Sequence, residues 1–433
     1  MKTIIYTTLI FFLSLNFAFS ESGWIRQTSF TTSNLFCVYF INSGTGWACG
    51  DSGKVLNTTN GGVNWSIQNS TTSLPLYSVM FADANTGWAV GGYDDHNPLC
   101  SHNVIVLKTT NGGANWLQQI SGIGYLYNDL FVVNNQTAYI SNSGICCPSF
   151  CIASAGSVSK TTNSGQNWTG SIYGASNSIY FLDSDKGWAL SYRSSDVPPY
   201  INYIYRTTNA GNNWEVLRSD TGYYYQYKNI MFVNDSTGYL YNHSLLKSTN
   251  GGFDWQKTDS ISTAGISNHF FINENTGWCC GGAGKIIRTN NGGANWSSQI
   301  SNSTNAFSSI HFVDAYIGWI VGSGGIILKT VSGGLTSVNQ SSSSIINSLN
   351  LNQNYPNPFN PKTIINYQLA INNVVSLKVY DALGKEVATI VNEKQNAGRY
   401  SVEFNGEGLP SGIYFYKLEA DNFVETKRMV LLK

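Results

Sequence analysis

An eight-residue motif that ends in tryptophan recurs along the chain and restricts the fold more than any other feature. Six copies keep the tryptophan: TTNGGVNW (58–65), TTNGGANW (109–116), TTNSGQNW (161–168), TTNAGNNW (207–214), STNGGFDW (248–255) and TNNGGANW (289–296). A seventh copy, TVSGGLTS (330–337), has lost it. A repeat spaced by about forty to fifty residues indicates a propeller or a solenoid, in which each repeat is one supersecondary unit.

A second marker alternates with the motif. It is a small residue followed by an aromatic residue, at Trp47, Trp88, Tyr139, Trp188, Tyr239, Trp278 and Trp319. Each repeat contains short apolar runs bounded by Gly- and Asn-rich turns, and the second repeat gives LYSVMFA, WAVGG, VIVLKTT and WLQQI. Four antiparallel strands per repeat are typical of a propeller blade. The sequence therefore predicts an all-β chain with a seven-bladed propeller over residues 21–337.

The motif itself is interpreted as the turn between the third and fourth strands of each blade. Its Asn closes an Asx turn, its glycines tolerate positive φ, and its tryptophan packs under the turn as the outer strand begins. The tryptophans with this structural role are Trp65, Trp116, Trp168, Trp214, Trp255 and Trp296.

Residues 23–28 resemble the outer strands of the other repeats, because Trp24-Ile25-Arg26-Gln27 matches NWLQQ and NWSSQ. The seventh repeat lacks such a strand at its own end. We therefore expect residues 23–28 to complete the last blade, with Trp24 buried. This closure joins the two ends of the array and removes exposed sheet edges.

TTNGGVNW resembles the Asp-box, S/T-x-D-x-G-x-S/T-W, with Asn60 in the Asp position. Together with the GWA-x-G marker, residues 21–337 resemble photosystem II assembly factor-like propellers of the Asp-box (BNR) repeat families. The resemblance implies a propeller but no single activity, because Asp-box propellers include sialidases, other glycan hydrolases, sorting receptors and assembly factors.

The repeats vary in length in one place. From the marker aromatic to the Asn of the turn (Ser332 in the last copy), the separations are 13, 23, 24, 21, 11, 13 and 13 residues. The extra residues fall between the second and third strands of blades 2, 3 and 4, so three long loops leave one face, opposite the motif turns. Long loops on a rigid repeat scaffold are where binding sites tend to lie.

We expect this loop face to bind an unidentified surface protein or glycan, because aromatic side chains are frequent in its loops. A competing interpretation is that the tyrosines, Tyr227 among them, only pack the enlarged loops against the blades. The candidate ligand-binding residues are Tyr93, Asp94, Asp95, His96, Tyr192, Arg193, Tyr200, Tyr203, Tyr223, Tyr224 and Tyr225.

Eight cysteines in an exported chain favour disulfides. Cys37 and Cys49 fall on adjacent strands, and Cys100 is expected to bridge to the blade 3 cysteines; Cys279 and Cys280 are either free or bridged. The disulfide candidates are Cys37, Cys49, Cys100, Cys146, Cys147 and Cys151. His96, His102 and Cys100 suggest a metal site, but their spacing matches no standard zinc pattern. We therefore expect no metal and no cofactor.

A sialidase-like or other glycan-degrading enzyme is the catalytic alternative. A sialidase needs an arginine cluster, a Tyr–Glu nucleophile pair and an acidic Asp. Arg206 and Arg288 occupy a repeat position that is lysine in four other copies, so they are interpreted as structural. The remaining propeller arginines are Arg26, Arg193 and Arg218. The recurring turn aspartates, interpreted as Asx caps, are Asp83, Asp183 and Asp314. We expect no catalysis, and an assembly or scaffold role is a second alternative.

The chain changes character after residue 337. A Ser-rich stretch (338–350) predicts a flexible linker, and short alternating strands in 351–433 predict a small Ig-like β-sandwich. The tail resembles the type A C-terminal sorting domain of the type IX secretion system through NYPNPFNP (354–361), VYDALG (379–384), LPSGIY (409–414) and KRMVLLK (427–433). The resemblance implies export by the type IX machinery of a bacterium of the Bacteroidetes kind, through residues 351–433.

Residues 1–20 predict a secretory signal peptide, with Lys2 before an apolar run from Ile4 to Phe17 and a small-x-small site at 18–20. No later run is long enough for a transmembrane helix. The 14 basic residues between positions 21 and 337 are scattered, so we expect no nucleic-acid partner. The sequence thus predicts a secreted or surface-attached bacterial propeller that binds a protein or glycan.

Overall fold

The computed structural model describes residues 23–93, 102–124, 126–142, 158–170, 172, 175–193, 200–222, 227–258, 265–335, 349–354, 357–369, 373–395, 398–421 and 423–432. The chain divides into two compact units, Met1–Ser337 and Val338–Lys433. The expected signal peptide lies outside the described residues.

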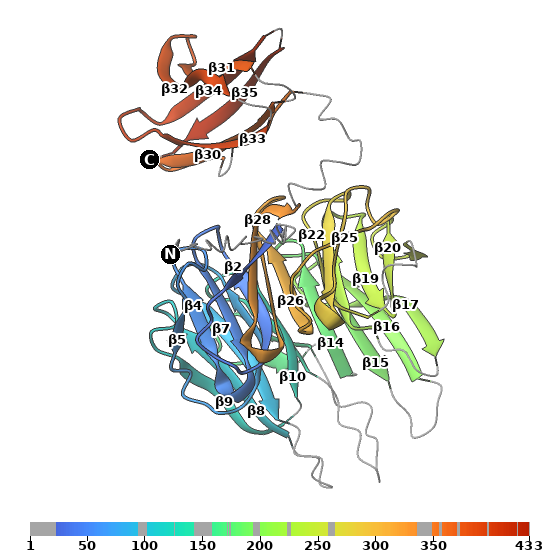
Figure 1. Cartoon of the computed structure of the whole chain (residues 1–433). Coiled ribbons are helices and arrows are strands. Elements are labelled where there is room, and N and C mark those ends of the chain that lie inside the picture. Colours follow the sequence, from blue (N-terminus) through green and yellow to red (C-terminus); the bar gives the residue numbers. More distant parts are fainter. Residues whose placement is uncertain are drawn as a thin grey trace, which may run out of the picture. The chain divides into compact units, whose positions relative to one another are not determined.

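The predicted all-β class is confirmed, because the first unit consists of seven four-stranded antiparallel sheets, the blades of a propeller (Figure 1). The strands of blades 1 to 3 are β2 (Leu35–Phe40), β3 (Gly46–Gly50), β4 (Val55–Thr58) and β5 (Ser66–Gln68); β6 (Leu76–Phe81), β7 (Gly87–Tyr93), β8 (His102–Thr109) and β9 (Leu117–Gly124); β10 (Tyr127–Val132), β11 (Ala138–Asn142), β12 (Val158–Thr161) and β13 (Thr169–Gly170). Those of blades 4 to 6 are β14 (Ala175–Phe181), β15 (Gly187–Arg193), β16 (Tyr200–Thr207) and β17 (Glu215–Gly222); β18 (Asn229–Phe232), β19 (Gly238–Asn242), β20 (Ser244–Ser248) and β21 (Gln256–Lys257); β22 (Ile266–Phe271), β23 (Gly277–Gly281), β24 (Ile286–Thr289) and β25 (Ser297–Gln299).

The seventh blade combines the two ends of this unit. Its strands are β26 (Phe307–Phe312), β27 (Gly318–Gly322), β28 (Ile327–Gly334) and the N-terminal β1 (Gly23–Gln27). β1 pairs antiparallel with β28, and Figure 1 shows this blue strand beside the orange one. Trp24 is 2% exposed, donates from Nε1 to Gln299 Oε1 at 2.9 Å and meets the Phe312 ring edge-on at 5.8 Å. The N-terminal strand therefore occupies the outer position that the seventh repeat leaves open.

The motif turn is held by its own polar side chains. Thr58 Oγ1 accepts from Gly62 N at 2.9 Å and donates to Asn60 Oδ1 at 3.0 Å, and Asn60 Oδ1 accepts from Asn64 N at 2.9 Å. Gly61 and Gly62 have φ values of +67° and +90°, which side chains with a Cβ rarely adopt. The same bonds recur at the turns of blades 2 to 6.

The core of the propeller lies between neighbouring blades. The marker aromatic of one blade stacks on a phenylalanine of the next, as Trp47 does on Phe81 at 3.5 Å, and the motif tryptophan Trp116 meets Phe81 edge-on at 5.9 Å. The small residue of the marker makes room for this ring, since a Cβ on Gly87 would lie 2.5 Å from Phe81. Five other interfaces repeat the stack: Tyr139–Phe181, Trp188–Phe232, Tyr239–Phe271, Trp278–Phe312 and Trp319–Phe40.

The second unit is a two-sheet β-domain with its own core. One sheet contains β29 (Asn350–Leu351), β30 (Lys362–Leu369) and β33 (Gly398–Asn405); the other has the order β32 (Glu386–Gln395), β31 (Asn373–Asp381), β34 (Gly412–Ala420) and β35 (Phe423–Leu431). The proline-rich entry runs along the edge of β35, where Phe359 N donates to Val430 O and Leu432 N donates to Phe359 O, both at 2.9 Å. This segment therefore covers backbone groups that an edge strand would otherwise expose.

Candidate functional site

The loop face differs strongly from one side of the ring to the other. In blades 2 and 4 the second, third and fourth strands have 7, 8 and 8 residues, whereas those of blade 1 have 5, 4 and 3. The added residues continue the pairing, to Tyr93↔Asn103 in blade 2 and Arg193↔Ile201 in blade 4. The inserted segments thus lengthen the sheets before the chain leaves them.

Blades 1, 6 and 7 have short connections at the same place. Each is a three-residue 3-10 turn: η1 (Asp51–Gly53), η2 (Gly282–Gly284) and η3 (Ser323–Gly325). A Cβ on Gly53 would lie 2.0 Å from Thr72 O, so the turn packs tightly against the connection to the next blade. Blades 2 and 4 therefore stand higher on the loop face than blades 6, 7 and 1.

The described candidate tyrosines point in different directions. Tyr93 is 53% exposed and lies on the side of β7 that carries Ala89, which packs against blade 1. Tyr203 shares its side of β16 with Tyr205, which packs toward blade 3; the two ring centroids are 5.8 Å apart. Tyr192 lies two residues after Leu190 on β15 and therefore on the same side of the strand, which packs toward blade 5. Strand alternation thus assigns these three tyrosines to three different blade interfaces.

Tyr227 belongs to the core, not to an open aromatic surface. It is 4% exposed in the cluster between blades 4 and 5, and its backbone O accepts from Asn177 Nδ2 at 3.1 Å. Its hydroxyl donates to Asp220, which also accepts from Arg218 Nε at 2.6 Å. Burial raises the pKa of Asp220, but these two hydrogen bonds lower it below its usual value. The packing interpretation therefore holds for Tyr227, and Arg218 is paired.

Other candidates lie outside what the structure describes. Arg193 and Tyr200 have a described backbone within β15 and β16. The candidates outside the described residues are Asp94, Asp95, His96, Tyr223, Tyr224, Tyr225, Cys100, Cys146, Cys147 and Cys151. Within the described ranges, no group of three or more His, Cys, Asp or Glu side chains could hold a metal ion.

Cys37 and Cys49 face each other as cross-strand partners of β2 and β3, and no disulfide joins them in this structure. Cys49 Sγ donates to Leu76 O at 3.3 Å in the next blade, and burial raises the pKa of its thiol. A bridge between them stays a prediction. Cys279 and Cys280 are buried free thiols.

A polar ring on the first strands was not found by sequence reasoning. The position three residues before the end of each first strand lies next to a register shift in most blades. In blades 1 to 7 it is occupied by Cys37, Ser78, Asp129, Ser178, Asn229, Asn268 and Ser309. Asp129 connects three blades, because it accepts from Ser78 Oγ at 3.4 Å, and from Ser178 Oγ and Ile179 N at 3.1 Å each. Burial raises the pKa of Asp129 to about 6, although the hydrogen bonds oppose the shift. Aligning the polar residues of the seven first strands would have revealed the ring.

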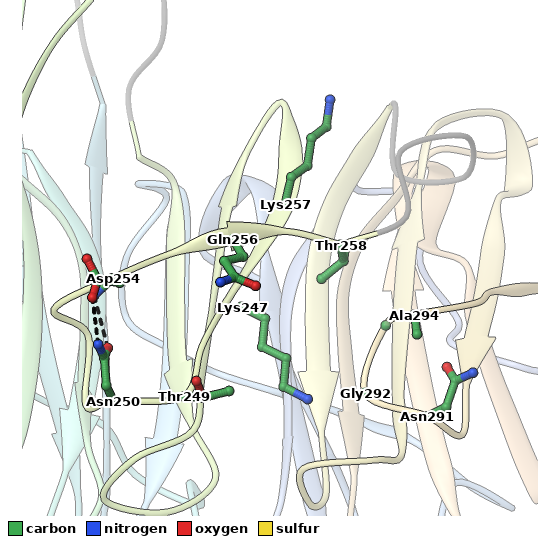
Figure 2. A pocket seen from close by; sticks show the side chains of 11 residues that line it. Lys247, Thr249, Asn250, Asp254, Gln256, Lys257, Thr258, Asn291, Gly292 and Ala294 are labelled. Atoms are coloured by element: carbon green, nitrogen blue, oxygen red, sulfur yellow. Dashed lines mark hydrogen bonds between the residues drawn. The ribbon is translucent and has the colours of Figure 1, made fainter.

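A separate groove lies on the side of the motif turns, between blades 5 and 6. Its volume is about 350 Å³. Figure 2 shows Lys247 and Gln256 from blade 5 on one side, and Asn291, Gly292 and Ala294 from the blade 6 turn on the other. Most of the lining side chains carry a polar group, and Gly292, Gly293 and Ala294 complete the lining.

Comparison with known proteins identifies both units. Residues 18–331 match the family described as photosynthesis system II assembly factor YCF48, and residues 353–432 match the secretion system C-terminal sorting domain. No curated protein matches the sequence. No helix in the described part of the chain is long and apolar enough to span a membrane.

Solved structures share the propeller fold. YCF48 bound to a D1 peptide is 21% identical, with a TM-score of 0.56 over 73% of this chain and 99% of that one. YCF48 from Cyanidioschyzon merolae is 18% identical, with a TM-score of 0.55 over 71% and 98%. A GH74 xyloglucanase from Xanthomonas campestris is 12% identical, with a TM-score of 0.53 over 72% of this chain and 54% of the enzyme. At these identities the likeness establishes the fold alone.

Proposed function

The chain belongs to the photosynthesis system II assembly factor YCF48 family, and from this premise we propose that it is a non-catalytic propeller that binds another polypeptide through the loop face of blades 2 to 4. Its second unit is a type IX sorting domain, so the chain is a bacterial protein that is secreted or attached to the outer-membrane surface. The partner is therefore expected outside the cell or on its surface.

The uneven loop face carries this proposal. Lengthened strands occur in blades 2 and 4, whereas blades 1, 6 and 7 keep three-residue turns. Elongated sheets on a rigid ring give a binding protein a fixed wall against which a chain can lie. One similar structure is YCF48 bound to a D1 peptide, so a related propeller holds a polypeptide.

The proposal is tested by shortening the wall. Residues 92–103 of blade 2, and separately 193–201 of blade 4, are replaced by the three-residue turn of blade 1. The variants and the parent chain are then probed on protein and glycan arrays, with melting temperature as the folding control. Loss of protein binding by a folded variant supports the proposal. Unchanged binding by both variants, or binding to glycans alone, contradicts it.

A glycan-degrading enzyme is the second candidate, and Asp129 is the observation that favours it. A carboxyl group whose pKa is about 6 is suited to proton transfer near neutral pH. Hydrolysis of chromogenic glycosides by the purified chain, abolished by Asp129→Asn, would establish this activity. No turnover above that of Asp129→Asn would exclude a role for this residue in glycan cleavage.

A further inference from the structure

The connection between blades 7 and 1 carries an exposed aromatic ring on a strained backbone. Phe30 lies between β1 and β2, is 71% exposed and has a φ of +54°. Bulky side chains rarely adopt this left-handed conformation, and residues held in it cluster at functional sites. Packing of the ring does not offset the strain, because most of the ring is open to solvent. A function of the exposed ring is therefore the better explanation for its presence.

The same type of connection joins blades 6 and 7, but with a better suited residue. In both connections a serine hydroxyl donates to the backbone O two residues later, Ser29 at 3.1 Å and Ser301 at 3.2 Å. Asn302, with a φ of +49°, stands at the position of Phe30, and Thr71 holds this position between blades 1 and 2. Asparagine tolerates the left-handed region well, so the fold of the turn does not require an aromatic residue.

Phe30 lines a groove that also contains two cations. The groove has a volume of about 750 Å³ and is lined by Arg26 from β1 and by Lys54 from the start of blade 1. Among the described residues, neither cation has an ion pair or a side-chain hydrogen bond, and no carboxylate lines the groove. Asp51, in the turn before Lys54, accepts from Asn34 Nδ2 at 2.9 Å. The positive charge of the groove is therefore available to a ligand.

The equivalent place between blades 6 and 7 is neutral. Ser298 stands at the position of Arg26, two residues after the tryptophan of the outer strand. Ile326 stands at the position of Lys54, directly after the three-residue turn. The two cations thus occur together with the strained aromatic ring, and the neutral pair occurs with Asn302. This combination indicates an anionic ligand with a face that can lie on an aromatic ring.

We propose that this groove binds an acidic saccharide, a sugar chain whose rings carry carboxylate groups. The C–H face of one sugar ring lies on the Phe30 ring, and its carboxylate accepts hydrogen bonds from Arg26 and Lys54. Thr28 and Thr32 are exposed and line the same groove, so their hydroxyls bind those of the sugar. The groove volume lies within the usual range of ligand sites.

A saccharide fits this groove better than an acidic peptide does. Phe30 is the one apolar residue among those that line the groove. A side chain that anchors a peptide fills a desolvated pocket, whereas a sugar ring needs one aromatic face with polar groups around it. The groove belongs to blades 7 and 1 and not to the lengthened blades 2 and 4, so this inference is independent of the proposed function.

The test titrates the full chain with tetragalacturonic acid, its methyl ester and a tetraglutamate peptide, by calorimetry. We expect the acid to bind and the ester to bind at least about tenfold more weakly, because the ester loses the charge-assisted hydrogen bonds. The peptide carries carboxylates without sugar rings and should not compete with the acid. The variants shortened in blades 2 and 4 should bind the acid as the parent chain does.

Three substitutions copy the neutral connection between blades 6 and 7. Phe30→Asn should weaken binding of the acid by at least about tenfold, with an unchanged or higher melting temperature, because asparagine suits this backbone. Arg26→Ser combined with Lys54→Ile should reduce the affinity for the acid to that for the ester. The matched control is Asn302→Phe, which places a ring where no cations lie and should leave binding unchanged. Absence of binding, equal binding of acid and ester, competition by the peptide, or full binding by Phe30→Asn would each overturn the proposal.

Discussion

At the scale of single residues, the surroundings of Asp129 oppose the charged form of its carboxyl group. Its pKa is about 6 in the folded chain, against 3.8 for an unperturbed group. The folded state therefore holds its proton up to a higher pH than the unfolded state does. The contribution of Asp129 to stability is highest below about pH 4, falls as the pH rises from about 4 to about 6, and stays reduced above pH 6.

We predict that Asp129→Asn removes this dependence. Two pKa units correspond to about 2.7 kcal/mol, and partial solvent access reduces the expected change to about 1–2 kcal/mol between pH 4 and pH 7. Asparagine is native at the aligned position in blades 5 and 6, so the variant should fold. Urea unfolding at several pH values measures the slope. An unchanged slope in the asparagine variant would contradict the assignment to Asp129.

Asp83 provides the control of opposite sign. Its carboxylate accepts from Asn85 N and Thr86 N, both at 2.7 Å, and the Thr86 bond is the main cause of its lowered pKa. Asp83→Asn should therefore remove stability that the parent gains as the pH rises through the acidic range. The same urea series distinguishes the two aspartates.

At the scale of the structural element, the motif turn depends on one hydroxyl. Thr58 Oγ1 accepts from Gly62 N and Asn60 N, and Thr58 is 2% exposed. Thr58→Ala leaves the buried Gly62 N–H without a partner, so we predict a loss of about 1–3 kcal/mol in the free energy of unfolding. Thr59→Ala, at the exposed neighbouring position, should change it by less than about 0.5 kcal/mol. Equal effects of the two substitutions would refute the role of the turn hydroxyl.

The elements were largely predictable because local chemistry repeats in each blade. The Asx role of Asp83, Asp183 and Asp314 is confirmed, because each carboxylate accepts hydrogen bonds from two backbone N–H groups of its own turn. Contacts between blades were not predictable in this way. The burial of Tyr227 depends on its packing between blades 4 and 5, and the role of Asp129 depends on partners about fifty positions away in the sequence.

The same limit applies to the candidate site. Length variation located the three enlarged connections, since insertions are visible in the sequence. Length variation did not show the directions in which Tyr93, Tyr192 and Tyr203 point. These directions depend on how the lengthened strands of blades 2 and 4 pair.

At the scale of the whole molecule, the ring is closed by the N-terminal strand. Trp24→Ala removes a buried indole, its bond to Gln299 and its contact with Phe312, so we predict a loss of about 3–5 kcal/mol. Ile25→Ala, at the next position and 58% exposed, is the matched control and should cost under about 1 kcal/mol. Thermal and urea unfolding measure both, and an unchanged melting temperature for Trp24→Ala would disprove the importance of this closure.

The two units should unfold independently. The buried core of the second unit is formed by its own residues, from Leu351 to Leu431, and the propeller clusters contain residues of the first unit alone. Residues that share one core unfold together in a single cooperative transition. Because the two units have separate cores, calorimetry of the full chain should show two transitions. Deleting residues 338–433 should remove one and leave the other within about 2 °C of its original position, the shift produced by about 1 kcal/mol in a chain of this size. A single transition in the full chain, or a propeller that melts much earlier without the tail, would mean that the sorting domain stabilises the propeller it accompanies.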